Sequence, residues 1–201
     1  MAGTIVPQLN NRLSRGFYTR PAAEVARDLL GQTLLRVAEN GDLIGGKIVE
    51  TEAYLAEHDP ASHSANGPTR RNRSMFQQPG TLYVYTIHAK YCMNVSTDWS
   101  DVGSAVLIRA IEPLWGIKQM AQARGQSDLR RLTRGPAMLC QALGITIADD
   151  GIDLLTSNKL TILPGEPIAA SEIAAGPRIG ISRATELPLR FYVSSSPFKS
   201  R

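Results

Sequence analysis

A tight turn between two strand patterns does most to limit how this chain can fold. Residues 39–42, Glu-Asn-Gly-Asp, separate two runs rich in β-branched and apolar side chains, 32–37 and 43–53. An Asn-Gly pair tolerates the positive φ angles that hairpin turns require. We therefore predict that the two runs pair as antiparallel strands. A helix is predicted just before them, over residues 21–30, because a proline opens it and Gly31 would end it.

The rest of the chain alternates strand patterns with short helical ones. Strands are predicted at 80–95, 104–111, 160–163, 178–181 and 190–193, and helices at 114–124 and 136–143. The polar stretch 54–79 is expected to be an irregular loop with a function, since long loops inside compact domains usually have one. Residues 149–175 otherwise carry little pattern. Together these patterns predict an α+β domain with a mainly antiparallel sheet.

The overall composition is that of a folded protein. With 201 residues, 43% of them hydrophobic, and a net charge of +4, the chain lies outside the regime of intrinsic disorder. No apolar run reaches the length of a signal peptide or the about 18 residues of a membrane span. Cys92 and Cys140 lie in apolar surroundings and are expected to be reduced thiols. We therefore expect a protein of the bacterial cytoplasm and nucleoid, or of the nucleus, that is not secreted.

Arginine strongly outnumbers lysine among the basic residues. The chain holds 22 Lys and Arg residues and has a sequence pI of about 9.3. The arginines form two groups, Arg70, Arg71 and Arg73 beside Thr, Asn and Ser, and Arg130, Arg131 and Arg134 before a predicted helix. Guanidinium groups suit phosphates, so the two groups together favour a nucleic-acid partner over the alternative, a surface of solvated charges.

Two carboxylates and two histidines occur around the end of the second predicted strand. Period-two alternation places Glu50 and Glu52 on one face, where one of them could act as a general base. The alternative is an edge strand with two solvated acids. His58, Asp59 and His63 follow, but their spacing fits no strong metal signature, so no metal site is predicted.

Aromatic residues alternate along the predicted strand at 80–95. Tyr83 and Tyr85 share one face, and Val84 takes the other. Aromatic residues at this spacing usually belong to the core. Beside arginines and an acidic strand end, however, a tyrosine can stack on a nucleobase. Both interpretations stay open at this point.

Seven segments, taken in order, resemble the alkyladenine (3-methyladenine, methylpurine) DNA glycosylase family. They are Ile48-Val-Glu-Thr-Glu-Ala-Tyr54, Ala61-Ser-His63, Arg71-Asn72 with Met75-Phe76, Pro79-Gly-Thr-Leu-Tyr-Val-Tyr85, Cys92-Met-Asn94, Val106-Leu-Ile-Arg-Ala-Ile-Glu-Pro113 and Arg134-Gly-Pro-Ala-Met-Leu-Cys-Gln-Ala-Leu143. The similarity extends over residues 17–200. It implies a mobile N-terminal extension, 1–16, and a single α+β domain, 17–201. That domain would have a curved, mainly antiparallel sheet, flanking helices and a protruding β-hairpin that inserts into DNA.

The resemblance also implies an activity. An enzyme of this family flips an alkylated purine, such as 3-methyladenine or 7-methylguanine, out of duplex DNA and hydrolyses the N-glycosidic bond, leaving an abasic site. No cofactor and no metal are expected. Since a cationic purine is a good leaving group, one carboxylate that deprotonates water suffices. Hypoxanthine and ethenoadenine are further candidate substrates, but these neutral bases need a general acid that the sequence does not identify. We expect a monomer whose partner is double-stranded DNA, not a membrane.

The resemblance assigns a role to six residues of the site. By similarity Glu52 is the general base, and Arg109 helps to hold the water and the acidic group. The flipped base would lie between rings that match Tyr54, His63 and Tyr85. Asn94 matches a residue that crowds the exocyclic amine of normal guanine, which would exclude that base sterically.

One departure from the family concerns the residue expected to enter the DNA. The family has Tyr-Val-Tyr-x-x-Tyr-Gly where this chain has Tyr83-Val-Tyr-Thr-Ile-His88-Ala89, and the run to Asn94 is one residue shorter. The last tyrosine of that motif fills the gap left by the flipped nucleotide, so the resemblance passes this role to His88. A histidine offers less apolar area and can protonate, which predicts weaker or pH-dependent holding of the flipped state. Further DNA contacts are expected from Arg70, Arg71, Arg73 and Arg134.

Three other functions are consistent with parts of the sequence. A non-catalytic protein that binds damaged DNA or RNA would use the same arginines and aromatic residues, but would not need Glu52 and Arg109. A metal-dependent or carbohydrate-acting hydrolase would use Glu50, Glu52, His58, Asp59 and His63. A glycosylase with lyase activity would need an amine nucleophile, for which Lys90 is the candidate nearest the aromatic strand.

Overall fold

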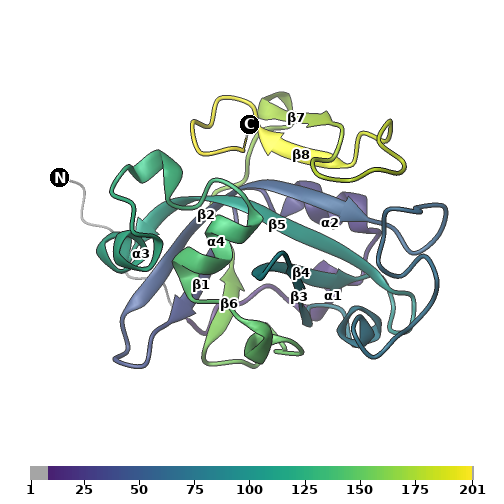
Figure 1. Cartoon of the computed structure of the whole chain (residues 1–201), viewed down its shortest axis with the longest axis horizontal. Helices are drawn as coiled ribbons and strands as arrows, with labels where there is room; N and C mark the ends of the chain where they lie inside the picture. Colours follow the sequence, from purple (N-terminus) through teal and green to yellow (C-terminus); the bar gives the residue numbers. More distant parts are fainter. Residues whose placement is uncertain (1–8, 201) are drawn as a thin grey trace.

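A strongly curved antiparallel sheet forms the centre of the computed structural model, which describes residues 9–200. Its strands lie in the order β3-β4-β5-β2-β1-β6, and β8 pairs with both β2 and β7. Helices α3 and α4 lie in front of the sheet in Figure 1, and α2 lies behind it. The predicted α+β fold with a mainly antiparallel sheet is therefore confirmed. None of the described helices is long and apolar enough to cross a membrane.

The element bounds are as follows. The strands are β1 Thr33–Val37, β2 Leu43–Tyr54, β3 Leu82–Ile87, β4 Lys90–Thr97, β5 Ser104–Trp115, β6 Leu160–Leu163, β7 Ile173–Gly176 and β8 Arg190–Val193. The helices are α1 Arg15–Tyr18, α2 Ala22–Asp28, α3 Ile117–Arg124 and α4 Pro136–Leu143. Four 3-10 helices connect them: η1 Arg73–Phe76, η2 Leu129–Arg131, η3 Ile147–Asp149 and η4 Ala170–Glu172.

The predicted hairpin at the start of the chain is present. Strands β1 and β2 pair antiparallel from Val37↔Leu43 to Thr33↔Lys47, and Gly41 in their turn has a φ of 83°. Two glycines of β2 are required by the close packing of its neighbours. A Cβ on Gly45 would fall on the carbonyl oxygen of Leu34, and one on Gly46 would fall on that of Glu112.

The helices on both sides bury apolar faces against the sheet. Helix α2 buries Ala22, Val25 and Ala26, as its helical spacing predicts. Helix α4 spans the predicted residues, buries Leu139, Cys140, Ala142 and Leu143, and ends at Gly144, which has a φ of 65°. Both cysteines are free and buried. These helices brace the long strands β2 and β5, which carry the charged residues described below.

The structure corrects three of the predicted elements. Residues 80–95 are not one strand but a hairpin, β3 and β4, that turns at His88 and Ala89. These two residues have φ angles of 46° and 58°, values that favour Gly or Asn, so their side chains gave no turn signal. Strand β5 continues through Trp115, and the predicted helix at 114–124 begins only at Ile117.

The third correction concerns residues 178–181, which were predicted to be a strand but form an irregular segment. The neighbouring strand is instead β7, in the stretch that showed little pattern. At the other end of the chain, residues 1–8 of the expected N-terminal extension lie outside the described residues. Leu13, within the same extension, is buried, and its N–H donates to the carbonyl of Ile162 at 3.3 Å.

Candidate functional site

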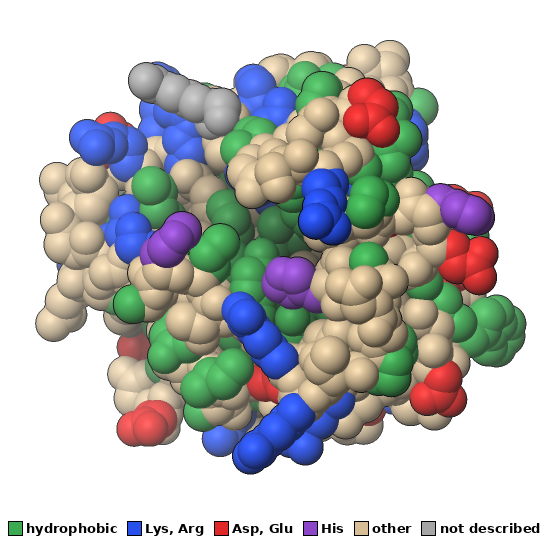
Figure 2. Space-filling view, turned by 45° about the vertical axis from the view of Figure 1, so that its right-hand side comes forward, with side chains coloured by type: hydrophobic (Ala, Val, Ile, Leu, Met, Phe, Trp, Pro, Cys, Tyr) green, Lys and Arg blue, Asp and Glu red, His purple; other side chains and the backbone are tan. Residues whose placement is uncertain are grey.

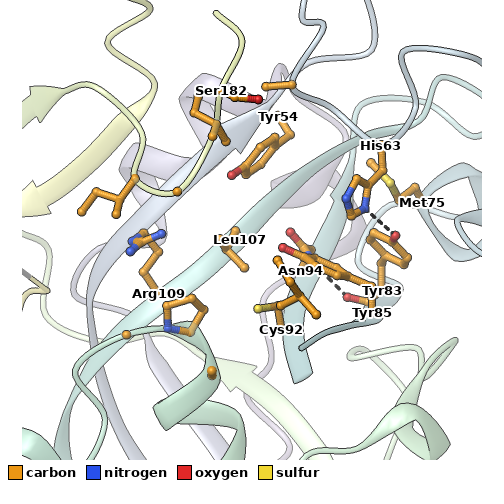
Figure 3. Close-up of a pocket in the computed structure, with 18 of the residues that line it drawn as sticks. Tyr54, His63, Met75, Tyr83, Tyr85, Cys92, Asn94, Leu107, Arg109 and Ser182 are labelled. Atoms are coloured by element: carbon orange, nitrogen blue, oxygen red, sulfur yellow. Dashed lines mark hydrogen bonds between the residues drawn. The ribbon is translucent and has the colours of Figure 1, made fainter. Parts of the chain in front are cut away.

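A pocket of about 690 Å³ opens between the hairpin β3–β4, the start of α4 and the segment 179–183. Strands β2, β4 and β5 contribute Tyr54, Asn94 and Arg109 to its walls, so residues from distant parts of the sequence meet there. Figure 3 shows these side chains converging on one space. Figure 2 shows a hollow with an apolar floor, and Lys and Arg side chains lie around its rim.

Aromatic side chains form two walls of this pocket. The rings of Tyr83 and Tyr85 are stacked with centroids 5.7 Å apart, and His63 meets Tyr85 edge-on at 4.5 Å. Tyr54 lies across the space from this group (Figure 3). The alternation along β3 thus places both tyrosines at the pocket, and they also pack in a hydrophobic cluster with Met75 and Ala105. Tyr83 is nevertheless almost fully buried, whereas Tyr85 is partly exposed.

His63 is held by a partner that the sequence did not single out for that role. Its Nδ1 forms a 2.8 Å hydrogen bond with the hydroxyl of Tyr83. Burial lowers the pKa of His63, and the nearby charge of Arg71 lowers it further, so the ring is neutral at pH 7. Burial also raises the pKa of Tyr83, which keeps its hydroxyl protonated. With Nδ1 engaged, Nε2 of His63 is the ring nitrogen left to contact a ligand.

The loop that carries His63 is fastened by Asn72. The amide Nδ2 of Asn72 donates to the carbonyl oxygens of His63, at 2.8 Å, and Gly67, at 3.1 Å, while its Oδ1 accepts from the N–H of Thr69 at 2.6 Å. Asn72 is 2% exposed. A buried amide with these three bonds fixes a loop that has little regular structure, so His63 is presented on a rigid support.

Glu52 is fully buried at the back of the pocket, where it contacts three of the lining residues. Its Oε2 accepts a hydrogen bond from the hydroxyl of Tyr54 at 2.9 Å, and its Oε1 lies 3.1 Å from Nη1 of Arg109. The N–H of Ile179 also donates to Oε1, at 2.7 Å. Within residues 9–200, Oε2 accepts from Tyr54 alone and can accept a further hydrogen bond. The carboxylate is thus oriented by three donors and keeps capacity for a water that enters from the pocket.

Arg109 explains why a charge interrupts the apolar pattern of β5. Its Nε lies 3.1 Å from Oε1 of Glu50, its Nη1 contacts Glu52, and its Nη2 lies 3.2 Å from Oγ of Ser200. Glu50 and Glu52 therefore share one face of β2, as period-two alternation predicts. The guanidinium is almost fully buried, and each of its three nitrogens has an oxygen partner, which offsets the cost of burial.

The C-terminal segment completes this cluster. Oε1 of Glu50 accepts hydrogen bonds from Nη1 of Arg190 at 3.2 Å and from Oγ of Ser200 at 2.7 Å, and the N–H of Ser200 donates to Oε2 at 2.6 Å. Arg134 is tied to the same segment because its Nε donates to the carbonyl of Lys199 at 2.7 Å. Sequence reasoning missed the part played by Ser200, because nothing local marks a serine whose partner is 150 residues away.

A second buried ion pair stands behind Tyr54. Arg178 donates to both carboxylate oxygens of Asp59, at 2.6 and 2.7 Å, and both side chains are fully buried. The guanidinium also stacks 4.7 Å from the centroid of the Tyr54 ring. Burial by itself raises the pKa of Asp59, but the hydrogen bonds and charge of Arg178, together with the N–H groups of Leu55 and Ala61, hold it below its ordinary value. Arg178 was missed as a site residue because it was assigned to a strand.

The side chains that a metal-dependent hydrolase would use as ligands are bonded to other residues or face solvent. Asp59 pairs with Arg178, His63 pairs with Tyr83, and His58 is exposed. Among residues 9–200, no group of three or more His, Cys, Asp and Glu side chains could hold a metal ion. The residues present therefore do not fit the metal-dependent alternative.

The remaining predicted site residues lie around the pocket. Asn94 lines it, is 4% exposed, and its Nδ2 donates to the carbonyl of Tyr83 at 3.2 Å. Arg70, Arg71 and Arg73 are exposed on the loop before and within η1. Arg71 is tied to the hairpin, since its Nη2 donates to the carbonyl of Thr86 at 2.7 Å. His88 is exposed at the tip of the hairpin and is not among the pocket-lining residues.

The chain is similar to known proteins over most of its length. A family model described as methylpurine-DNA glycosylase (MPG) matches residues 16–197. The chain is 44% identical to the DNA-3-methyladenine glycosylase of Mus musculus over 207 residues, 95% of this chain and 62% of the mouse protein. It is also 44% identical to that of Homo sapiens, over 94% of this chain and 68% of the human protein. A relative from Rhodopirellula baltica is 49% identical over 193 residues, 94% of this chain and 82% of the relative.

Proposed function

The chain belongs to the methylpurine-DNA glycosylase family, and from this membership we propose that it is a monofunctional DNA-3-methyladenine glycosylase whose general base is Glu52. The observation that carries the assignment of the base is the environment of its carboxylate. Glu52 is fully buried, yet it is oriented by Tyr54, Arg109 and Ile179 at the wall of a pocket large enough for a purine. Burying a carboxylate in this way costs stability, which favours a functional explanation.

The proposed reaction needs a single proton acceptor. In an alkylated purine such as 3-methyladenine the ring is cationic, so the electron pair of the breaking N-glycosidic bond neutralises the leaving base. Water then adds to C1′ of the sugar while the carboxylate of Glu52 takes its proton. Arg109 contacts Glu52 at 3.1 Å and would fix the carboxylate toward that water. 7-Methylguanine fits the same scheme, whereas hypoxanthine and ethenoadenine would require protonation from a further group.

The aromatic walls support binding of a base that has left the helix. We propose that Tyr54 stacks on one face of the flipped purine and that Tyr85 and His63 contact it from the other side. Electron-rich rings attract a cationic purine more than a neutral one. Asn94, almost fully buried at the pocket wall, would collide with the exocyclic amine of normal guanine.

The basic rim supports double-stranded DNA as the partner. Arg70, Arg71 and Arg73 are exposed on the segment between His63 and Met75, two residues that line the pocket. Arg134 lies just before the start of α4, which also lines it. We propose that they contact phosphates on both sides of the lesion, with His88 at the hairpin tip as a further contact. We expect the protein to act as a monomer and, because its substrate is DNA, in the nucleoid or nucleus.

The test is release of free 3-methyladenine from methylated duplex DNA in the presence of EDTA. The wild-type chain is compared with Glu52→Gln and with Glu166→Gln, a control at an exposed glutamate. Release that persists in EDTA, collapses in Glu52→Gln by about 100-fold or more, and is retained in the control is the expected result. If the wild type binds DNA but releases no base, the protein is a damaged-DNA-binding protein instead. If Glu52→Gln releases base at the wild-type rate, another group is the general base.

A further inference from the structure

The hairpin β3–β4 extends beyond the rest of the sheet. Among the described strands, β3 is at the sheet edge and pairs with β4 alone, while Leu82 at its start also bonds to the backbone of Gly151 and Ile152. Strand β4 pairs with β5 from Asn94 to Thr97, so within residues 9–200 the end of the hairpin from Tyr85 to Cys92 has no further strand beside it. The hydrogen bond from Arg71 to the carbonyl of Thr86 supports that end from the loop side. The tip is therefore a firm projection at the mouth of the pocket.

One large apolar side chain at this tip is exposed to solvent. Ile87 is 45% exposed although it is a large aliphatic residue, and it is among the residues that line the pocket. It follows Tyr83 and Tyr85 on the same face of β3, and exposure rises along this row from the buried Tyr83 to Ile87. The row of side chains thus runs from the pocket wall to its rim, and Ile87 is its outermost member.

His88 occupies a different position. It is the first residue of the two-residue turn, with a φ of 46°, and so it departs from the strand alternation that carries Ile87 into the pocket rim. It is exposed, and the pocket lining contains Ile87 and not His88. A charged or polar ring at the outer tip suits contact with the sugar-phosphate backbone rather than with the apolar interior of a base stack.

We propose that Ile87 is the side chain that fills the gap in the duplex when a purine enters the pocket, while His88 contacts the backbone beside it. The inference rests on the proposed glycosylase function. A flipped nucleotide leaves unstacked bases above the pocket mouth, and an apolar side chain inserted there compensates for part of the lost stacking. Ile87 meets both requirements, since it is apolar and lies on the same row as the base-binding tyrosines.

The test compares duplex DNA with single-stranded DNA, because an unpaired base leaves no gap to fill. Single-turnover release of 3-methyladenine is measured on methylated duplex and on the separated strands for four proteins: wild type, Ile87→Ala, His88→Ala and Ile117→Ala. Ile117 is 40% exposed and does not line the pocket, so it is a matched control. Binding to a duplex with a stable abasic-site analogue is the second measurement, since that duplex has the gap but no base.

We expect Ile87→Ala to lose about tenfold in duplex release and in affinity for the abasic duplex, with a change of about twofold or less on single strands. His88→Ala should lose about threefold or less on either substrate, and Ile117→Ala should match the wild type. The proposal is overturned if Ile87→Ala loses the same factor on both substrates, which would place Ile87 in base binding. It is also overturned if His88→Ala shows the duplex-specific loss instead. If the wild type releases no 3-methyladenine from the duplex or from the single strands, the proposed function itself is refuted.

Discussion

Replacing Arg178 with methionine should destabilise the protein through Asp59, a residue that the substitution leaves intact. The guanidinium supplies two of the hydrogen bonds to the Asp59 carboxylate, at 2.6 and 2.7 Å, and solvent reaches neither side chain. Methionine has a similar length and no charge, so the substitution removes the partner without opening a large cavity. What remains is a buried carboxylate held only by the backbone N–H groups of Leu55, at 3.0 Å, and Ala61, at 3.2 Å.

The loss of unfolding free energy in Arg178→Met can be worked out from the Asp59 charge that stays buried. Removing one member of a buried ion pair costs about 3–5 kcal/mol, because the other charge stays buried without compensation. The two backbone donors satisfy part of the Asp59 carboxylate, so we expect the free energy of unfolding to fall by about 3 kcal/mol in Arg178→Met. The double variant Asp59→Asn/Arg178→Met buries no charge and should recover at least half of that loss.

Urea unfolding of the wild type, both single variants and the double variant measures these differences. The pKa of Asp59 is lowered in the folded protein, so its contribution to stability is fully present above its ordinary value of 3.8 and is lost as pH falls through the lower, folded value. Asp59→Asn should lack this acid-dependent loss. A fall of less than 1 kcal/mol in Arg178→Met, or a double variant as unstable as the sum of the single ones, would refute the reasoning.

Three further predictions concern the pocket and its rim. In Arg71→Ala, the slope of log K for DNA binding against log salt concentration should become less steep by about one. DNA titrations at several salt concentrations measure this slope. An unchanged slope would show that Arg71 contacts no phosphate. In Tyr83→Phe, loss of the hydrogen bond to His63 should lower kcat/KM about fivefold. In the wild type, burial lowers the pKa of His63 below 6.5, so this residue should add no inflection to the kcat/KM profile between pH 6.5 and 8. An inflection in that range that Tyr83→Phe shifts would contradict a neutral His63.

The parts of the site that alternate along a strand could be predicted from the sequence. Period-two alternation placed Glu50 and Glu52 on one face of β2 and the tyrosines on one face of β3, whereas Arg109 was identified through the family resemblance. The tyrosines and Arg109 line one pocket, and Glu52 contacts Arg109 beside it. The loop residue His63 was identified only through the ordered set of motifs around it. Its geometry depends on Asn72, whose hydrogen bonds reach five and nine residues back along the chain.

The parts that could not be predicted depend on contacts between distant segments. Arg178 meets Asp59 across 119 residues, and Ser200 meets Glu50 across 150. Neither pairing leaves a local pattern, since an arginine or a serine in a polar segment usually faces solvent. The turn of the β3–β4 hairpin was implied by the family resemblance but missed by the strand pattern, for a different reason. His88 and Ala89 adopt positive φ angles, although turns of this kind normally contain Gly or Asn at such positions. The tertiary structure therefore determines this turn, against the local preference of its residues.

The buried charges around the pocket are balanced in number, and this balance bears on the proposed reaction. The carboxylates are Glu50, Glu52 and Asp59, and the guanidiniums that contact them are Arg109, Arg178 and Arg190. A cationic purine therefore meets buried side chains whose charges cancel, although the exposed Arg183 also lines the pocket. As the N-glycosidic bond breaks, positive charge moves from the purine to the sugar. The total charge is unchanged, but a carboxylate beside the sugar would stabilise the new location of the positive charge. On this argument Glu52 would act electrostatically before it accepts a proton from water, so Glu52→Asp should impair bond cleavage even though it keeps a basic group.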